Sequence, residues 1–224
     1  MNFLAKPGET TAIIGGTGSG KSTLVDLILR FYDVSEGEIL VDGINIKTAT
    51  QKELRARIGY VPQTAALFSG TVADNLRYGR ENATAEELED AAKIAQAADF
   101  IMETENSYSA LLSEGGRNLS GGQRQRLSIA RALVRRPEIY VFDDSFSALD
   151  FKTEAALRTA LQKGAGNATI FIVAQRVGTV MNADRIIVLD NGAVAGMGTH
   201  QELIKNCRVY QDIVSSQFSK EELA

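Results

Sequence analysis

Short apolar runs alternate along the chain with longer stretches of helical periodicity, and this alternation predicts the fold class. Apolar runs of this length, bounded by turn residues, are typical of buried strands. The runs that we interpret as strands cover residues 10–14, 38–41, 58–61, 139–142, 169–173 and 185–189. Because strand and helix patterns alternate, the chain predicts an α/β domain with a mainly parallel central sheet.

A turn signal follows the last of these runs. Asp190-Asn191-Gly192 has the composition of a tight hairpin turn, and residues 193–197 continue as a further strand. The sequence therefore predicts an antiparallel hairpin at the edge of the sheet.

Helix starts are marked by capping boxes, in which a Ser or Thr and a Glu or Gln three residues later each accept a hydrogen bond from the other's backbone N–H. The pairs with this spacing are Thr50/Glu53, Thr84/Glu87, Ser120/Gln123 and Thr199/Glu202. Each pair precedes a stretch with helical character, so each predicts the N-terminus of a helix. Two short helices, over residues 201–205 and about 209–218, are expected at the C-terminal end.

Strand signals vanish between residues 64 and 134, where helical patterns replace them, as at residues 85–98 and 121–134. We interpret this segment as a helical lobe inserted into the α/β core. The chain contains no internal repeat and no low-complexity linker. We therefore expect one domain over residues 1–224.

Composition excludes several classes of protein. A formal net charge of −4 gives no electrostatic reason to expect nucleic-acid binding. The single cysteine, Cys207, excludes an internal disulfide. No apolar stretch approaches the roughly 20 residues needed to cross a bilayer, and the N-terminus lacks the pattern of a secretory signal. We expect this stretch, taken alone, to be soluble.

Residues 15–22 fit the phosphate-binding pattern G-x-x-x-x-G-K-[ST]. The run lies between an apolar strand and a helical stretch, whose N-terminus adds unpaired N–H donors and a positive dipole end. Lys21 would neutralise the β- and γ-phosphates, and the Ser22 hydroxyl would ligate Mg²⁺. The predicted nucleoside triphosphate site consists of Gly15, Gly16, Thr17, Gly18, Ser19, Gly20, Lys21, Ser22 and Thr23.

Two other segments carry candidate chemistry. The run at residues 139–142 ends in two carboxylates, and Asp143 is the candidate for holding Mg²⁺ opposite the loop serine. A Ser-Gly-Gly turn at a helix start forms a second anion site. Its residues are Ser120, Gly121, Gly122 and Gln123. One chain therefore presents two phosphate-binding surfaces.

In combination these motifs resemble the ATP-binding-cassette (ABC) ATPase family over essentially the whole chain. In family order come the phosphate loop, Gln63 in Tyr60-Val61-Pro62-Gln63, the signature Leu119-Ser120-Gly121-Gly122-Gln123, the Asp143 strand and Ser147-Ala148-Leu149-Asp150, which looks like the family's D-loop. The resemblance implies a P-loop NTPase (RecA-like) core with an inserted helical lobe. It also implies ATP and Mg²⁺ as ligands, and ATP hydrolysis as the reaction.

Partners are implied by the same resemblance. Domains of this family pair head to tail and hold two ATP molecules, each between the phosphate loop of one domain and the signature of the other. Gln63 would then sense the γ-phosphate and Mg²⁺ and couple to a transmembrane domain. By the same resemblance, Glu114 lies in the stretch before the signature that contacts this membrane domain. We expect no nucleic-acid partner.

Two segments favour the exporter branch of the family. Residues 67–76 look like the exporter version of the entry to the helical lobe, and residues 198–203 resemble the exporter C-terminal pattern. The resemblance therefore implies work at the cytoplasmic face of a membrane, within a multidrug- or lipid-type exporter.

Two catalytic positions depart from the family's pattern. Asp144 stands where the family has the glutamate that polarises the attacking water, and its carboxylate reaches roughly 1.5 Å less far. A misplacement of about 1 Å can cost on the order of 10²-fold in rate. Gln175 stands where the family has its switch histidine, and an amide neither carries charge nor shuttles a proton near neutral pH. His200, the single histidine, opens a late helix and is interpreted as structural.

Both departures fall in one composite site, which favours a degenerate site that binds ATP and turns it over slowly. The intact signature can still complete a partner's active site, as in one half of a heterodimeric exporter. Three alternatives stay open. They are an active homodimer in which Asp144 and Gln175 suffice, a soluble ABC protein acting on DNA or ribosomes, and a regulatory ATP-binding module.

The phosphate loop begins after only 14 residues. Members of the family have an earlier strand and an aromatic residue that stacks on adenine. Phe3 is the one aromatic residue upstream of the loop, and we interpret it as a core residue. We therefore expect a domain truncated on its N-terminal side, whose base selectivity the sequence does not predict.

Overall fold

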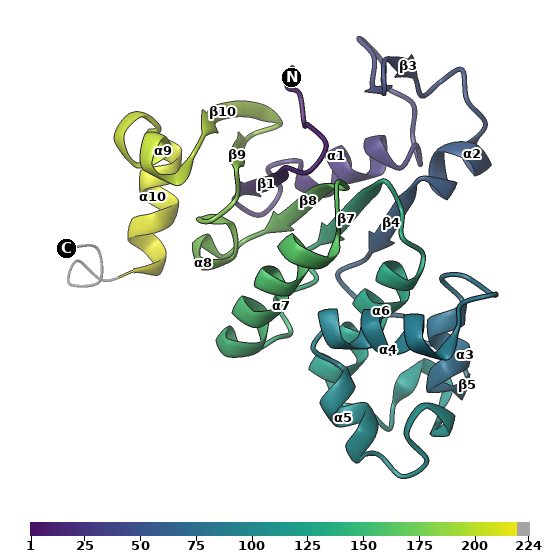
Figure 1. The fold of residues 1–224 in the computed structure, drawn as a ribbon. Helices are drawn as coiled ribbons and strands as arrows, with labels where there is room; N and C mark the ends of the chain where they lie inside the picture. Colours follow the sequence, from purple (N-terminus) through teal and green to yellow (C-terminus); the bar gives the residue numbers. More distant parts are fainter. Residues whose placement is uncertain (219–224) are drawn as a thin grey trace. The chain divides into compact units, whose positions relative to one another are not determined.

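The computed structural model describes residues 1–218 (Figure 1). Within it the chain divides into two compact units. The first unit contains Met1–Ile58, Glu138–Asp144 and the described residues from Ala168 to Phe218. The second unit contains Gly59–Pro137 and Ser145–Asn167. Each unit is therefore assembled from segments that are far apart in the sequence.

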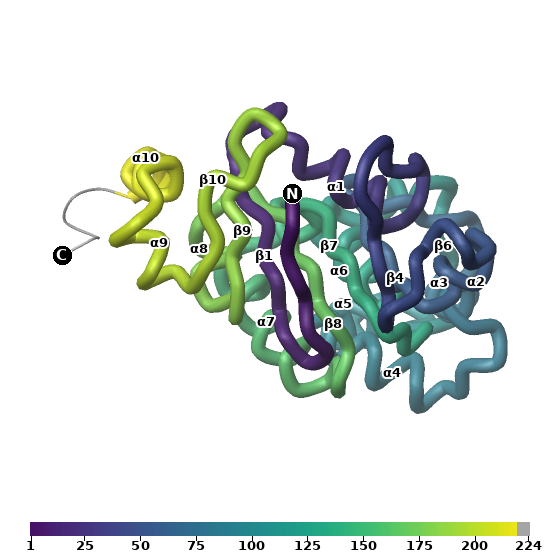
Figure 2. Tube along the Cα trace, turned by 90° about the horizontal axis from the view of Figure 1, so that it is seen from above, coloured from purple at the N-terminus to yellow at the C-terminus, as the bar shows by residue number. Residues whose placement is uncertain are grey.

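The first unit is built on a parallel sheet. Its strands are β1 (Thr10–Gly15), β7 (Ile139–Asp143), β8 (Thr169–Ala174), β9 (Arg185–Asp190) and β10 (Ala193–Gly198). In space they follow the order β10-β9-β1-β8-β7 (Figure 2). β10 pairs antiparallel with β9, and the other pairs are parallel. Strand β1 lies between β8 and β9 and is buried along its whole length. The predicted α/β class, with its parallel sheet and antiparallel edge hairpin, is confirmed.

The register of the parallel strands brings three loops to one edge of this sheet. Ile13 of β1 lies beside Val173 of β8, and Val173 in turn lies beside Asp143 of β7. Because these strands point the same way, the segments that follow them leave the sheet from its carboxyl edge, where α/β sheets bind ligands. The phosphate loop, Asp144 and Gln175 therefore start from neighbouring positions.

Helices and a small hairpin complete the first unit. The helices are α1 (Lys21–Ile28), α2 (Gln51–Ala56), α8 (Val177–Val180), α9 (His200–Asn206) and α10 (Arg208–Gln217), and the hairpin pairs β2 (Leu40–Val41) with β3 (Ile44–Asn45). The predicted capping boxes at Thr50 and Thr199 are both formed. The strand expected over residues 38–41 is shorter than predicted, because pairing is limited to its last two residues before a tight turn at Gly43.

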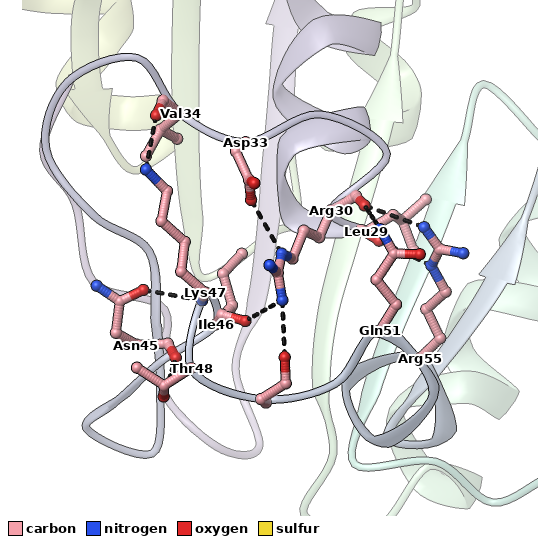
Figure 3. A network of polar contacts seen from close by, with 11 residues as sticks. Leu29, Arg30, Asp33, Val34, Asn45, Ile46, Lys47, Thr48, Gln51 and Arg55 are labelled. Atoms are coloured by element: carbon pink, nitrogen blue, oxygen red, sulfur yellow. Dashed lines mark hydrogen bonds and ion pairs between the residues drawn. The ribbon is translucent and has the colours of Figure 1, made fainter.

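Arg30, two residues beyond the end of α1, lies at the centre of a polar network (Figure 3). Its guanidinium donates hydrogen bonds to the carbonyl oxygens of Ile46 at 2.9 Å and Ala49 at 2.7 Å, and to Asp33 Oδ1 at 2.9 Å. The carbonyl oxygen of Arg30 itself accepts from Arg55 Nη2 at 3.0 Å. These bonds tie the C-terminal end of α1, whose N-terminus begins at the phosphate loop, to the segment that follows it.

The second unit is mainly helical. It contains α3 (Val72–Arg77), α4 (Ala85–Ile94), α5 (Ala98–Glu103), α6 (Gly121–Val134), α7 (Phe151–Gly164), the 3-10 turns η1 (Ser107–Ser109) and η2 (Glu114–Gly116), and the strands β5 (Gly70–Thr71) and β6 (Leu111–Leu112). β4 (Ile58–Val61) starts at the last residue of the first unit and continues in the second. Helix α6 packs against α3 and α4, and most of its residues are buried. The capping boxes predicted at Thr84 and Ser120 are formed.

Three details of the second unit differ from the prediction. The segment expected to lack strands contains the β5–β6 pair, whose two-residue strands are too short to give a periodic signal. The helix predicted over residues 85–98 is broken, because Gln96 adopts φ 56° and the N–H of Ala97 bonds back to Ala92 at 2.7 Å, which ends α4 at Ile94. Helix α7 was not predicted.

Candidate functional site

The phosphate loop follows β1 and leads directly into α1. A Cβ atom on Gly15 would lie 2.3 Å from the carbonyl oxygen of Leu189 and 2.5 Å from Ser19 Oγ, so a larger residue does not fit. Gly18 and Gly20 have φ values of 78° and 98°, which favour glycine. The backbone therefore requires glycine at these three positions, as expected of a loop whose N–H groups turn toward a phosphate.

Lys21, the first residue of α1, closes the phosphate loop. Its Nζ donates hydrogen bonds to the carbonyl oxygens of Gly15 and Gly16, each at 2.8 Å. Burial lowers the pKa of Lys21, and the charges of Asp144 and Asp143 oppose that shift. The loop thus holds a largely desolvated cation, for which an anion such as a phosphate is a favourable ligand.

Ser19 lies inside the loop and is 4% exposed. Its Oγ is buried and has no hydrogen-bond partner among the described residues, which fits a loop shaped around a polar ligand. The carbonyl oxygen of Ser19 accepts from the N–H of Gly192 at 3.1 Å. The turn between β9 and β10 therefore supports the phosphate loop, a contact that the Asn-Gly turn signal alone does not predict.

Asp143 and Asp144 end β7, and Gln175 follows β8. Asp143 is the last residue of its strand, and Asp144 turns the chain with φ 45° while its N–H donates to the carbonyl oxygen of Val173 at 2.9 Å. Gln175 Nε2 donates a hydrogen bond to Asp144 Oδ2 at 3.3 Å. The first unit therefore brings together Lys21 and the three predicted residues Asp143, Asp144 and Gln175.

The predicted signature opens α6 in the second unit. Ser120 Oγ accepts from the N–H of Gln123 at 3.2 Å, and Gln123 Oε1 accepts from the N–H of Ser120 at 2.9 Å. A Cβ atom on Gly122 would lie 3.2 Å from the carbonyl oxygen of Ala148, so the predicted D-loop packs closely on the start of this helix. Since Ser120 acts as an acceptor in its cap, its hydroxyl hydrogen is available to an anion.

Three other predicted residues also lie in the second unit. Gln63 is exposed and follows Pro62, whose carbonyl oxygen accepts from Gln125 Nε2 at 3.0 Å. Asp150 caps α7 by accepting from the N–H of Thr153 at 2.9 Å, and this bond lowers the pKa of Asp150. Glu114 begins η2. The functional roles of these three residues stay predictions.

Comparison with known proteins identifies the family. A family model described as ABC transporter matches residues 1–147. An uncharacterized ABC transporter ATP-binding protein of Mycobacterium tuberculosis is 50% identical over 220 residues, which are 97% of this chain and 38% of that protein. The chain belongs to the ABC transporter family. Another ABC transporter ATP-binding protein, from Bacillus subtilis, is 47% identical over 221 residues, covering 99% of this chain and 38% of the relative.

A solved structure supports the same assignment. The structure of a bacterial Atm1-family ABC exporter with ATP bound matches with a TM-score of 0.93 and 40% identity, over 97% of this chain and 38% of that chain. This ABC transporter chain thus spans little more than a third of the length of these relatives. The likenesses support the expected ATP-binding domain of an ABC exporter. Within residues 1–218, no helix is both long and apolar enough to cross a membrane.

Proposed function

We propose that this ABC chain is the ATP-binding domain of an exporter, with a site of its own that binds Mg-ATP but turns it over slowly. The observation that carries the proposal is the contact between Gln175 and Asp144. This contact supports the proposal, because the two residues that we predict to depart from the family's pattern touch on the sheet edge that also bears the phosphate loop. The bound nucleotide would be held by residues 15–23 together with Asp143.

The chemistry of this pair supports the proposal of low turnover. A general base must accept a proton from water, and general-base catalysis contributes about 10²–10⁴-fold to the rate. The shorter carboxylate of Asp144 reaches less far toward water than glutamate does. Gln175 donates an amide hydrogen to that carboxylate, so one of its oxygens is already engaged by a neighbouring side chain. A carboxylate is still present, so slow hydrolysis is expected rather than none.

The phosphate loop fits ATP and Mg²⁺. Gly15 leaves no space for a side chain, and Lys21 supplies a desolvated positive charge. Within residues 1–218, no group of three or more His, Cys, Asp or Glu side chains is placed to hold a metal. Mg²⁺ commonly binds one or two protein ligands together with substrate phosphates, and Ser22 and Asp143 suit that role. When bound, Mg²⁺ would neutralise charge on the phosphates, and the role of Gln63 stays the one that the resemblance to the family implies.

The signature would act on the nucleotide of a partner domain. Ser120, Gly121 and Gly122 would offer donors at the N-terminus of α6 to the γ-phosphate held by a second ABC domain. That second domain would belong to a different chain and pair head to tail with this one. The pair would drive the transmembrane domain of an exporter at the cytoplasmic face of a membrane.

The test is steady-state ATP turnover of the purified chain as a function of its concentration, with nucleotide binding confirmed independently. Near-zero turnover alone, with stimulation of a competent partner domain, is the expected result. Turnover that rises steeply with concentration would mean an active homodimer, in which Asp144 and Gln175 suffice.

A further inference from the structure

The loop that carries Gln175 is held by one side chain from the C-terminal helix. Gln217, the last residue of α10, donates from Nε2 to the carbonyl oxygen of Gln175 at 2.7 Å. Its Oε1 accepts from the backbone N–H of Val177 at 2.8 Å. The side-chain amide of Gln217 therefore holds both ends of the short loop that connects β8 to α8.

Helix α10 is itself anchored in the first unit. Tyr210 is 0% exposed and Val214 is 2% exposed. Gln217 follows Val214 by three residues and Tyr210 by seven, which places all three on one face of the helix. The two buried residues therefore hold this face of α10 against the first unit, and Gln217, which is exposed, lies at the C-terminal end of the same face.

The far side of the same loop faces the nucleotide site. Gln175 Nε2 donates to Asp144 Oδ2 at 3.3 Å, and the Asp144 charge acts on Lys21 of the phosphate loop. A shift of the loop backbone at Gln175 would therefore move its amide away from Asp144. The contacts form one continuous path from α10 to the end of β7.

We propose that Gln217 is a positioning residue for the nucleotide site, because it fixes the backbone from which Gln175 reaches Asp144. This inference rests on the proposed function, since the place of Gln175 matters only where the site holds ATP. Gln175 is expected to act at the γ-phosphate. Loss of the two hydrogen bonds from Gln217 to the loop, which we call the clamp, should therefore weaken ATP binding more than ADP binding.

The first test measures the clamp without nucleotide. Gln217→Ala removes both hydrogen bonds to the loop. Gln211→Ala is the matched control, because Gln211 on the same helix donates to the carbonyl oxygen of Ile204 at 2.7 Å and does not bond the loop. Hydrogen exchange at the Val177 amide should be faster in Gln217→Ala than in the wild type, and unchanged in the control. Equal exchange in all three proteins would overturn the proposal.

The second test measures affinity for Mg-ATP and Mg-ADP by displacement of a fluorescent nucleotide. Gln217→Ala should bind ATP roughly threefold to tenfold more weakly and ADP as the wild type does. Gln217→Glu keeps the acceptor for Val177 but sets a carboxylate oxygen against the carbonyl oxygen of Gln175, so it should weaken ATP binding at least as much as Gln217→Ala. An equal loss for ATP and ADP would indicate a general structural role and contradict positioning.

Failure of the proposed function would give a different result. In that case the wild-type chain would either bind neither nucleotide or hydrolyse ATP at a rate that rises steeply with its concentration, while exchange at Val177 would still report whether Gln217 holds the loop. If the wild type binds ATP, and the Gln217 variants bind ATP and ADP as tightly as the wild type does, only the proposed positioning role of Gln217 is wrong.

Discussion

Gln175 donates a hydrogen bond to Asp144 at 3.3 Å, so the two residues that we predict to depart from the family's pattern contact each other directly. Their effects on catalysis should therefore be coupled rather than additive, as is usual for residues in one hydrogen-bond network. A change at either position alters the surroundings of the other.

Restoring both family residues should raise turnover. We predict that Asp144→Glu combined with Gln175→His increases steady-state ATP hydrolysis on the order of 10²-fold, because a longer base and an ionisable donor are regained together. Each single variant should raise turnover by much less than about 10-fold, which is the square root of the gain expected for the double variant. Glutamate is less suited than aspartate to the φ of 45° at this position, so thermal unfolding should be measured alongside.

The matched control makes the same chemical changes on the exposed side of α10, as Gln211→His with Asp212→Glu. This control should hydrolyse ATP at the wild-type rate. If the wild-type chain already hydrolyses ATP as fast as the double variant, the assignment of a degenerate site is wrong.

Gly15 and Gly16 should differ sharply in their tolerance of a methyl group. Gly15→Ala places Cβ 2.3 Å from the Leu189 carbonyl oxygen, whereas a Cβ on Gly16 meets nothing within 4 Å. We predict that Gly15→Ala lowers the free energy of unfolding by roughly 1–3 kcal/mol or more, and that Gly16→Ala changes it by less than about 1 kcal/mol. Urea denaturation compares the two variants, and equal losses would contradict the close packing described for β1 and β9.

The Arg30 network should contribute measurably to stability. Arg30→Met leaves the carbonyl oxygens of Ile46 and Ala49 without their charged donor, and we predict a loss of about 2–3 kcal/mol in the free energy of unfolding. Asp33→Ala is the control, because Asp33 is 54% exposed and its ion pair with Arg30 should be worth about 0–1 kcal/mol. Similar losses in the two variants would show that the ion pair, rather than the backbone contacts, carries the network.

His200 should make the fold less stable in mild acid. Its Nδ1 lies 2.8 Å from the Tyr210 hydroxyl, and burial lowers the pKa of His200 while raising that of Tyr210 to about 12. The folded state therefore binds fewer protons than the unfolded state near and below pH about 6.5. The free energy of unfolding should fall as pH drops through that value and level off below the lowered pKa of the folded protein.

His200→Gln keeps a hydrogen-bonding side chain that does not titrate. Thermal unfolding measured from pH 8 to pH about 5 should be less pH-dependent in this variant than in the wild type. An unchanged pH profile would assign the acid sensitivity to other groups.

Elements with strong local signals were predicted well. The β1 strand, the turn after β9 and the four capping boxes all depend on residues within a few positions of one another, and all are formed. Helix α7 was missed because its cap is Asp150 with Thr153, which lacks the Ser/Thr and Glu/Gln spacing. The cap of α3 pairs Thr71 with Asp74 and fails the same pattern, although it forms a complete capping box.

The site was predictable where chemistry follows a contiguous motif and not where it depends on distant contacts. The phosphate loop could be located from eight successive residues, 15–22. The bond between Gln175 and Asp144, by contrast, joins residues 31 positions apart and follows from the register of β7 and β8. The bonds from Gln217 join residues 40 and 42 positions apart, so no local pattern contains them.

The contact between Gly192 and Ser19 limits where this domain can accept foreign sequence. Turns with Asn and Gly at the tip of a hairpin are ordinarily good places for an epitope tag or a fluorescent reporter, since insertions at exposed tips are well tolerated. Here the Gly192 N–H supports the phosphate loop at 3.1 Å, so an insert would displace the backbone of that loop. A probe attached at this turn would interfere with nucleotide binding, and by the same contact it would respond to that binding.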